Sequence, residues 1–219
     1  YLIADEVTLE DDSAQWCSFS LGGAAVEDAV LRLAGGEVAP ASARQVEGAW
    51  LARAWGRERG WWCLWMRRDA RERWLSRLAE AGAVAVGEAE VARARILAGI
   101  PAVPVDIGPD DLPNEGGLDE TAISYTKGCY LGQEVMARLK NLGQVRRRLH
   151  VVRGAGQLPA ARTALMQGER RVGEVRSVAA AGGDGEFVAF AMLSLVNFDP
   201  AAPLRLDGRG DAVEVVPHG

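Results

Sequence analysis

The sequence predicts an α+β protein built from three consecutive parts. Residues 14–87 follow the order strand, helix, strand, strand, helix, strand, which is the ferredoxin-like βαββαβ pattern. Residues 101–117 are rich in proline and glycine, which is typical of a loop that wraps around a domain. From residue 145 onward, short strand patterns alternate with turns, which predicts a small β-barrel or sandwich.

The first half of the ferredoxin-like part has a strand followed by an amphipathic helix. The strand is predicted at Trp16–Leu21 and ends at a Gly-Gly pair. In the following helix, Val26, Ala29, Val30 and Leu33 recur at helical spacing, so they share one apolar face.

The second half is predicted to contain three strands and one helix. Two strands are expected at Ala49–Ala54 and Trp61–Met66, and a short last strand at Ala83–Val86. Asp69 is expected to cap the helix between them, because Glu72 follows at the capping-box spacing.

Two more helices and four barrel strands are predicted further along the chain. The helices are expected at residues 88–98 and 133–140. Asp184-Gly185 and Asp207-Gly208 are favourable hairpin turns. The strands are expected at residues 147–153, 171–179, 187–193 and 212–216.

The charge and apolar patterns exclude several classes of protein. The 219 residues carry a formal net charge of -5, which disfavours general nucleic-acid binding but leaves a local basic patch open. No apolar run approaches the ~18 residues that a membrane helix needs. The chain starts at Tyr1 in a strand-like segment, so we expect part of the protein to lie N-terminal to it.

The cysteines and histidines give no metal-ligand spacing. Cys17, Cys63 and Cys129 are far apart, and the two histidines form no cluster with them, so no zinc or iron–sulfur site is predicted from this chain alone. An odd number of cysteines without a signal peptide favours a reducing compartment, and we expect the cytoplasm.

The segment Lys127-Gly128-Cys129-Tyr130-Leu131-Gly132-Gln133-Glu134 carries the most chemical information. A thiol reacts as its thiolate, and Lys127 together with the N-terminus of the following helix could favour that form of Cys129. The two glycines allow a ligand to approach the backbone closely. Alternatively, Cys129 is a buried filler residue and Lys127 a solvated charge.

This segment resembles the KGCYxGQE signature of the folate-binding YgfZ family, which shares its fold with the aminomethyltransferase (T protein) of the glycine cleavage system. Further segments resemble family motifs in the same order along the chain. These are Arg95–Pro101 (RILAGIP), Pro113–Asp119 (PNEGGLD), Gly143 with Val145–Leu149 (VRRRL) and Gly173–Ser177 (GEVRS).

The resemblance implies a partial aminomethyltransferase-like folate-binding fold with an inserted ferredoxin-like domain and a C-terminal β-barrel. The folate-binding part would comprise residues 1–13 and 88–144, the ferredoxin-like domain residues 14–87, and the barrel residues 145–219. The expected cofactor is tetrahydrofolate or a derivative. Because the family's N-terminal portion is missing here, part of the folate pocket would lie outside this chain.

The resemblance also implies site residues. Cys129 and Lys127 would be the working pair, and Glu115 is a candidate carboxylate for the pterin ring. The cofactor would further contact Gly128, Tyr130, Gly132, Gln133 and Glu134. A second carboxylate, Glu58, only faintly resembles the pterin-binding turn of T proteins, and a solvent-exposed turn is the simpler interpretation. Five tryptophans lie between Trp50 and Trp65; we expect most of them in a core and Trp55 to be exposed.

Three functions are consistent with these observations. The first is an accessory protein that supports iron–sulfur cluster assembly or repair in selected enzymes, including tRNA-modifying ones, with iron–sulfur enzymes or assembly proteins as partners. The second is a true aminomethyltransferase, although T proteins lack the octapeptide. The third is a non-enzymatic module that binds protein or RNA, including tRNA, through Arg146–Arg148 and an exposed tryptophan.

Overall fold

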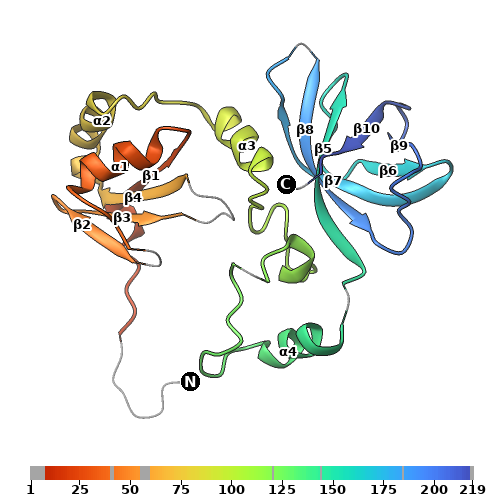
Figure 1. The fold of residues 1–219 in the computed structure, drawn as a ribbon, viewed down its shortest axis with the longest axis horizontal. Coiled ribbons are helices and arrows are strands. Elements are labelled where there is room, and N and C mark those ends of the chain that lie inside the picture. The colour runs from red at the N-terminus through yellow and green to blue at the C-terminus, as the bar shows by residue number, and fades with distance from the viewer. Residues whose placement is uncertain are drawn as a thin grey trace. The chain divides into compact units, whose positions relative to one another are not determined.

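A computed structural model describes residues 8–39, 42–54, 60–119, 121–143, 145–183 and 185–217. By internal contacts the chain divides into a first unit, Tyr1–Ala85, and a second unit, Val86–Gly219. Figure 1 shows their elements along the chain. No helix among the described residues is long and apolar enough to span a bilayer.

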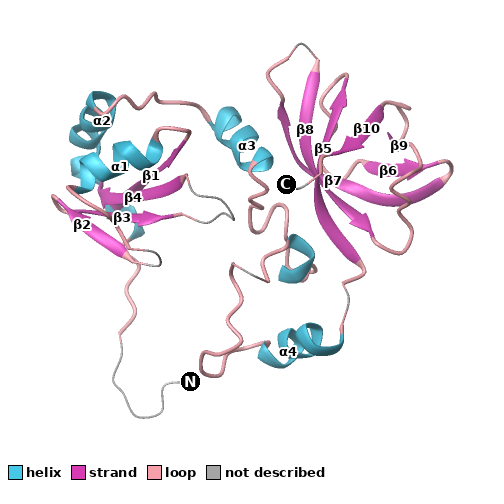
Figure 2. Ribbon diagram, viewed as in Figure 1, coloured by secondary structure: helices cyan, strands magenta, loops and turns pink. Residues whose placement is uncertain are grey.

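The first unit contains a four-stranded antiparallel sheet in the order β1-β4-β3-β2 (Figure 2). Its strands are β1 (Trp16–Gly22), β2 (Ala43–Val46), β3 (Ala49–Arg53) and β4 (Trp61–Arg67). Short 3-10 turns, η1 (Ser13–Gln15) and η2 (Arg68–Ala70), flank β1 and α2. The helices are α1 (Val26–Ala34) and α2 (Arg71–Glu80).

The core of the first unit lies between the sheet and its two helices. Val30 of α1 and Trp74 of α2 are buried in the same cluster as Trp62 and Leu64 of β4. Residues two apart on a strand share a face, so Trp65 lies on the opposite face of β4, where it pairs with Trp50. These two indoles are about 40% exposed. Among the tryptophans expected in the core, Trp62 is buried, Trp61 is half-buried, and Trp50 and Trp65 are exposed. Trp55 lies outside the described residues.

The element order of this unit differs from the predicted βαββαβ pattern. Ala83–Val86 is not a strand, and both Val84 and Val86 are exposed. The fourth strand is instead β2, for which no strand was predicted. Strands β1, β4 and β3 keep the neighbour order of the ferredoxin-like pattern, with β2 added at the edge.

The start of α2 also differs in detail from the prediction. Asp69 lies within η2, one turn before the helix, and the N-cap residue is Ala70, which has no side-chain capping bond. Glu72 pairs with its neighbour Arg71 instead of closing a capping box.

The second unit begins with α3 (Glu88–Leu97), a long loop that contains η3 (Pro113–Gly116), and α4 (Gln133–Leu142). A closed barrel follows, in the order β10-β5-β8-β7-β6-β9. Its strands are β5 (Arg147–Ala155), β6 (Ala164–Gln167), β7 (Arg170–Ala180), β8 (Glu186–Ser194), β9 (Leu204–Leu206) and β10 (Ala212–Val215).

Strand β8 is the centre of the barrel. Its residues Phe187–Leu193 are all buried, because the barrel core contacts one face and α3 with the following loop contacts the other. At Gly173 of β7, an added Cβ atom would lie 2.4 Å from the carbonyl oxygen of Met192, so this strand contact requires glycine.

The predicted α+β class with a C-terminal barrel is confirmed. The hairpin at Asp207-Gly208 joins β9 to β10 as expected, whereas Asp184 lies outside the described residues. Strands β6 and β9 have only four and three residues and were not predicted. The finer assignment of residues 1–13 and 88–144 to a folate-binding domain stays a prediction.

Candidate functional site

The signature octapeptide forms an exposed turn that leads into α4. Gly132 is the N-cap residue, with a left-handed backbone (φ 89°), a conformation that favours glycine. Cys129 and Leu131 are exposed. The expectation of a buried filler thiol therefore does not apply to Cys129.

The cation of this turn contacts an aromatic ring. The ammonium nitrogen of Lys127 lies 4.7 Å from the ring centroid of Tyr130, and the Lys127 backbone N–H donates to Ser124 Oγ at 3.2 Å. At the start of α4, Glu134 forms an exposed ion pair with Arg138. The turn thus presents Cys129 to solvent beside a Lys127–Tyr130 stack.

The other two cysteines lie in less accessible surroundings. Cys17 and Cys63 are half-buried in the sheet of the first unit. Burial raises the pKa of the Cys63 thiol and outweighs the opposing hydrogen bond with Ser20. Cys129 is therefore the thiol that a partner could reach most easily.

A cavity of about 680 Å³ lies beside α4 in the second unit. We call it the α4 cavity. None of the eight predicted site residues lines it. Its lining residues come from the loop before the signature, from α4 and the segment after it, from the start of β5 and from the residue that follows β8. They are Asn114, Asp119, Ile123, Tyr125, Leu139, Lys140, Gly143, Val145, Arg148 and Leu195.

The α4 cavity combines unpaired acceptors with cations. Asn114 Oδ1 and Asp119 Oδ1 are buried and have no hydrogen-bond partner among the described residues. The Lys140 ammonium lies 4.1 Å from the ring centroid of Tyr125, and Arg148 supplies a second positive charge. The lining as a whole combines an amide and a carboxylate with two cations, so the cavity suits a ligand that brings both N–H donors and an anionic group.

Glu115, the predicted pocket carboxylate, is engaged inside the protein. Its two oxygens accept from Arg147 Nε at 3.0 Å and Nη2 at 2.8 Å, and Oε2 also accepts from the Leu112 backbone N–H at 2.9 Å. Its neighbours Asn114 and Asp119 line the cavity instead. The sequence signals that could have indicated the cavity are Lys140, one of only two lysines, and Arg148 in the arginine triplet.

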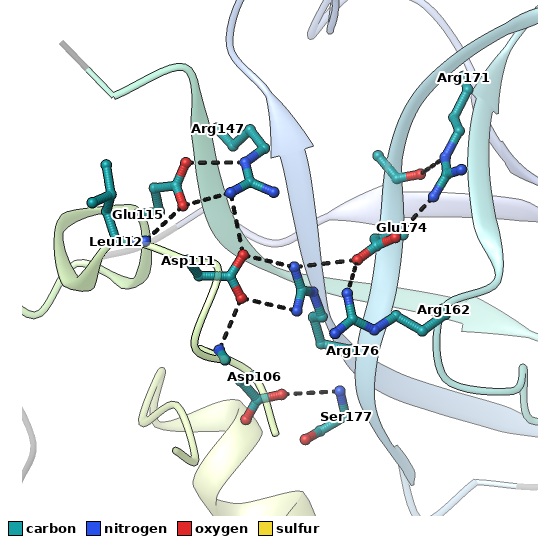
Figure 3. Close-up of polar contacts among 12 residues, drawn as sticks. Asp106, Asp111, Leu112, Glu115, Arg147, Arg162, Arg171, Glu174, Arg176 and Ser177 are labelled. Atoms are coloured by element: carbon teal, nitrogen blue, oxygen red, sulfur yellow. Dashed lines mark hydrogen bonds and ion pairs between the residues drawn. The ribbon is translucent and has the colours of Figure 1, made fainter. Parts of the chain in front are cut away.

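Glu115 belongs to a carboxylate–arginine network that fixes the loop beneath the cavity to the barrel (Figure 3). Arg176 of β7 is 2% exposed and makes two 3.0 Å hydrogen bonds to Asp111. Arg147 of β5 joins Asp111, at 3.2 Å, to Glu115. The network therefore connects the Pro113–Asp119 motif to β5 and β7.

A second buried carboxylate connects α3 to the same strand. Asp106 is fully buried and accepts from the backbone N–H groups of Ala102 at 2.8 Å and Ser177 at 2.9 Å. Arg95 of α3 donates to Asp106 and, at 2.9 Å, to Ser177 Oγ. Four motifs that are far apart in the sequence are thus connected through the carboxylates of Asp106, Asp111 and Glu115.

We expect stability of the second unit to fall in acid because of Asp111. Burial alone would raise the pKa of Asp111, but the hydrogen bonds from Gly108 and Arg176 and the nearby Arg147 hold it below 3.8. A carboxylate with a lowered pKa stabilises the fold fully above its unfolded pKa and loses that contribution as the pH falls through the folded value. Calorimetric unfolding between pH 7 and pH 2 measures this loss.

The matched variant is Asp111→Asn, which cannot titrate at this position. It should be less stable than the parent at pH 7, and the difference between the two proteins should shrink as the pH falls below about 3.8. A constant difference across that range would contradict the pKa argument.

Comparison with solved structures defines the class of fold. The chain superimposes on the glycine cleavage system aminomethyltransferase T from Bartonella henselae with a TM-score of 0.68 and 20% identity, covering 86% of this chain and 55% of that one. The chain therefore shares the fold of part of an aminomethyltransferase.

Sequence comparison narrows this class. Residues 146–218 match the family described as CAF17, C-terminal beta-barrel domain. The chain is 43% identical over 67 residues to the human mitochondrial iron–sulfur cluster assembly factor IBA57, covering 30% of this chain and 19% of that protein. The IBA57 homolog of Phaeosphaeria nodorum is 40% identical over 68 residues, which cover 28% of this chain and 17% of that protein.

These findings confirm the resemblance to the YgfZ/CAF17 type of protein. The matched segments span about a fifth of the length of the curated relatives. Within the described residues, no group of three or more histidine, cysteine, aspartate or glutamate side chains is arranged to hold a metal ion.

Proposed function

We propose that this chain is part of a tetrahydrofolate-binding accessory protein that supports iron–sulfur cluster assembly or repair. The observation that carries the proposal is the α4 cavity, whose lining combines the polar side chains of Asn114 and Asp119 with the cations Lys140 and Arg148. The assignment to iron–sulfur cluster assembly is supported by the similarity to relatives that are named as assembly factors for these clusters.

The acceptor end of the cavity suits a pterin ring. The pterin edge carries neighbouring N–H donors, and Asp119 and Asn114, whose side chains contain acceptor oxygens, line the cavity. A hydrogen bond to a charged acceptor contributes about 1.5–3 kcal/mol. These two residues would hold the ring edge, while the Tyr125 ring and aliphatic side chains such as Ile123 and Leu195 would contact its faces.

The cationic end suits the glutamate tail of a folate. Lys140 and Arg148 line the same cavity, and guanidinium and ammonium groups form strong hydrogen bonds with carboxylates. A volume of about 680 Å³ falls within the ~300–1,000 Å³ range of sites for ligands of this size. The residues present therefore fit a reduced folate in both charge and size.

Cys129 would serve the iron–sulfur partner separately from the folate cavity. It is exposed on the turn before α4 and does not line the cavity. Thiolates are the usual protein ligands of iron–sulfur clusters, so an exposed thiol is suited to contact a partner that carries a cluster. The Lys127–Tyr130 stack would position this turn.

We expect Cys129→Ser in the full-length protein to abolish most of its support for dependent iron–sulfur enzymes. The measurement is the activity of such an enzyme in a host that lacks its own copy of the gene. Thr126→Ala, at an exposed position in the same turn, is the control and should retain activity. Full activity of Cys129→Ser would contradict the thiol assignment while leaving folate binding unaffected.

The aminomethyltransferase fold by itself does not indicate aminomethyl transfer, because one fold supports many activities. A coupled assay with an aminomethyl-loaded lipoyl carrier protein distinguishes the two functions. We expect no methylenetetrahydrofolate from this protein. Stoichiometric or faster formation of that product would favour the transferase.

A further inference from the structure

Arginines from two distant parts of the sequence meet at one end of the barrel. Strands β5 and β7 are both antiparallel to β8, which lies between them. The beginnings of β5 and β7 therefore lie beside the end of β8. This arrangement brings Arg146 and Arg147 to the same end of the barrel as Arg170 and Arg171; we call these four residues the arginine end.

A small notch lies within the arginine end. It has a volume of about 230 Å³, and its lining includes Arg147, Arg171 and Ser194. The side chains of Arg147 and Arg171 are 41% and 60% exposed. Ser194 Oγ accepts from the Asn197 backbone N–H at 3.2 Å, which leaves its hydroxyl proton for a ligand.

The carboxylates near this notch are already used by the protein. Glu174, which also lines it, pairs with Arg162, Arg171 and Arg176 (Figure 3). Asp111 and Glu115, which anchor Arg147, have side chains only 4–5% exposed. Fixed carboxylates thus hold the guanidinium groups in place from the protein side.

The exposed members of the arginine end add further positive charge. Arg146 is exposed, and Arg170 is exposed and donates to the neutral side chain of Asn197. Glu169, which directly precedes Arg170 in the sequence, is also exposed and contributes one negative charge. The chain's net charge of -5 therefore conceals a local surface of opposite sign.

We propose that the arginine end binds the phosphate backbone of a nucleic-acid strand. Each phosphodiester of a strand has two non-bridging oxygens that carry its charge, and Arg147, Arg171 and Ser194 line one notch in which they can donate to these oxygens. Guanidinium groups also match phosphate geometry in pairs. The extension of positive charge beyond the notch, to Arg146 and Arg170, favours a strand with successive phosphates over a single small phosphate.

The test is the binding of a fluorescently labelled single-stranded RNA, measured by anisotropy as a function of salt. With about 0.7 counterions released per phosphate on a single strand, four contacts predict a slope of about -3 in a plot of log K against log salt. Arg146→Ala combined with Arg171→Ala should lower the slope to about -1.5 and weaken binding at least tenfold at low salt.

Arg153→Ala is the matched control, because Arg153 is exposed on β5 and lies at the other end of that strand. It should change affinity less than twofold. An equal loss in Arg153→Ala, or no RNA binding at low salt, would overturn the proposal. The proposal would also be overturned if a polyglutamate peptide, or inorganic phosphate alone, displaced the labelled RNA as well as unlabelled RNA does at equal charge. Affinity for a reduced folate should be the same in all these variants, so this test is independent of the proposed function.

Discussion

Replacing Arg176 with methionine is expected to destabilise the second unit by about 3–5 kcal/mol, the usual effect of removing one partner from a buried ion pair. Arg176 is 2% exposed and makes both of its 3.0 Å hydrogen bonds to Asp111, whose side chain is 4% exposed. The variant leaves the Asp111 carboxylate buried with Arg147 as its remaining cation.

Two further variants make this stability test specific. Arg176→Met combined with Asp111→Leu should recover part of the lost stability, because the unpaired charge is removed as well. Arg138→Ala, which breaks the exposed pair with Glu134, should cost less than about 1 kcal/mol. A change below about 1 kcal/mol in Arg176→Met would contradict the buried network.

The choice of probe matters for that measurement. All seven tryptophans lie between Trp16 and Trp74, in the first unit. Tryptophan fluorescence therefore reports the unfolding of the first unit. Unfolding of the second unit should be measured by differential scanning calorimetry or circular dichroism.

Asp119→Ala is expected to weaken binding of a reduced folate by roughly 10- to 100-fold, which corresponds to the loss of one charge-assisted hydrogen bond. Asp119 lines the α4 cavity, so the variant removes the carboxylate that would accept the N–H groups of the pterin edge. Isothermal titration calorimetry with 5-formyltetrahydrofolate, which is stable in air, measures the change.

Glu134→Ala separates the cavity from the signature turn as the binding site. Glu134 is a cofactor contact implied by the family resemblance, but its side chain is 78% exposed and it does not line the cavity. We expect Glu134→Ala to bind the folate like the parent protein. The opposite pattern, with affinity lost in Glu134→Ala and kept in Asp119→Ala, would move the site to the signature turn.

The sequence predicts most elements where the apolar pattern is long. The periodic helix at α1 and the buried run in β8 are both found at the expected places. It fails where the pattern is short, as at β9 with three residues. Ala83–Val86 was predicted as a strand from its local sequence. No neighbouring strand pairs with it, and local preference alone does not make it a strand.

The candidate site is predictable only in part, for a different reason. The motif containing Glu115 marks the right loop, but sequence cannot show that Arg147, 32 residues later, takes up that carboxylate. Nor does it show that Asp119 and Lys140 line one cavity. Such pairings depend on tertiary contacts. The turn that contains Cys129, in contrast, follows from the local sequence, because Gly132 can adopt the left-handed backbone conformation that the turn requires.

A crystal structure of the chain with 5-formyltetrahydrofolate tests the central claim most directly. We expect the pterin edge within about 3.2 Å of the side-chain oxygens of Asp119 and Asn114, the usual limit of a hydrogen bond, and the glutamate tail beside Lys140 and Arg148. A folate bound elsewhere on the chain, with the α4 cavity containing only solvent, would contradict the account.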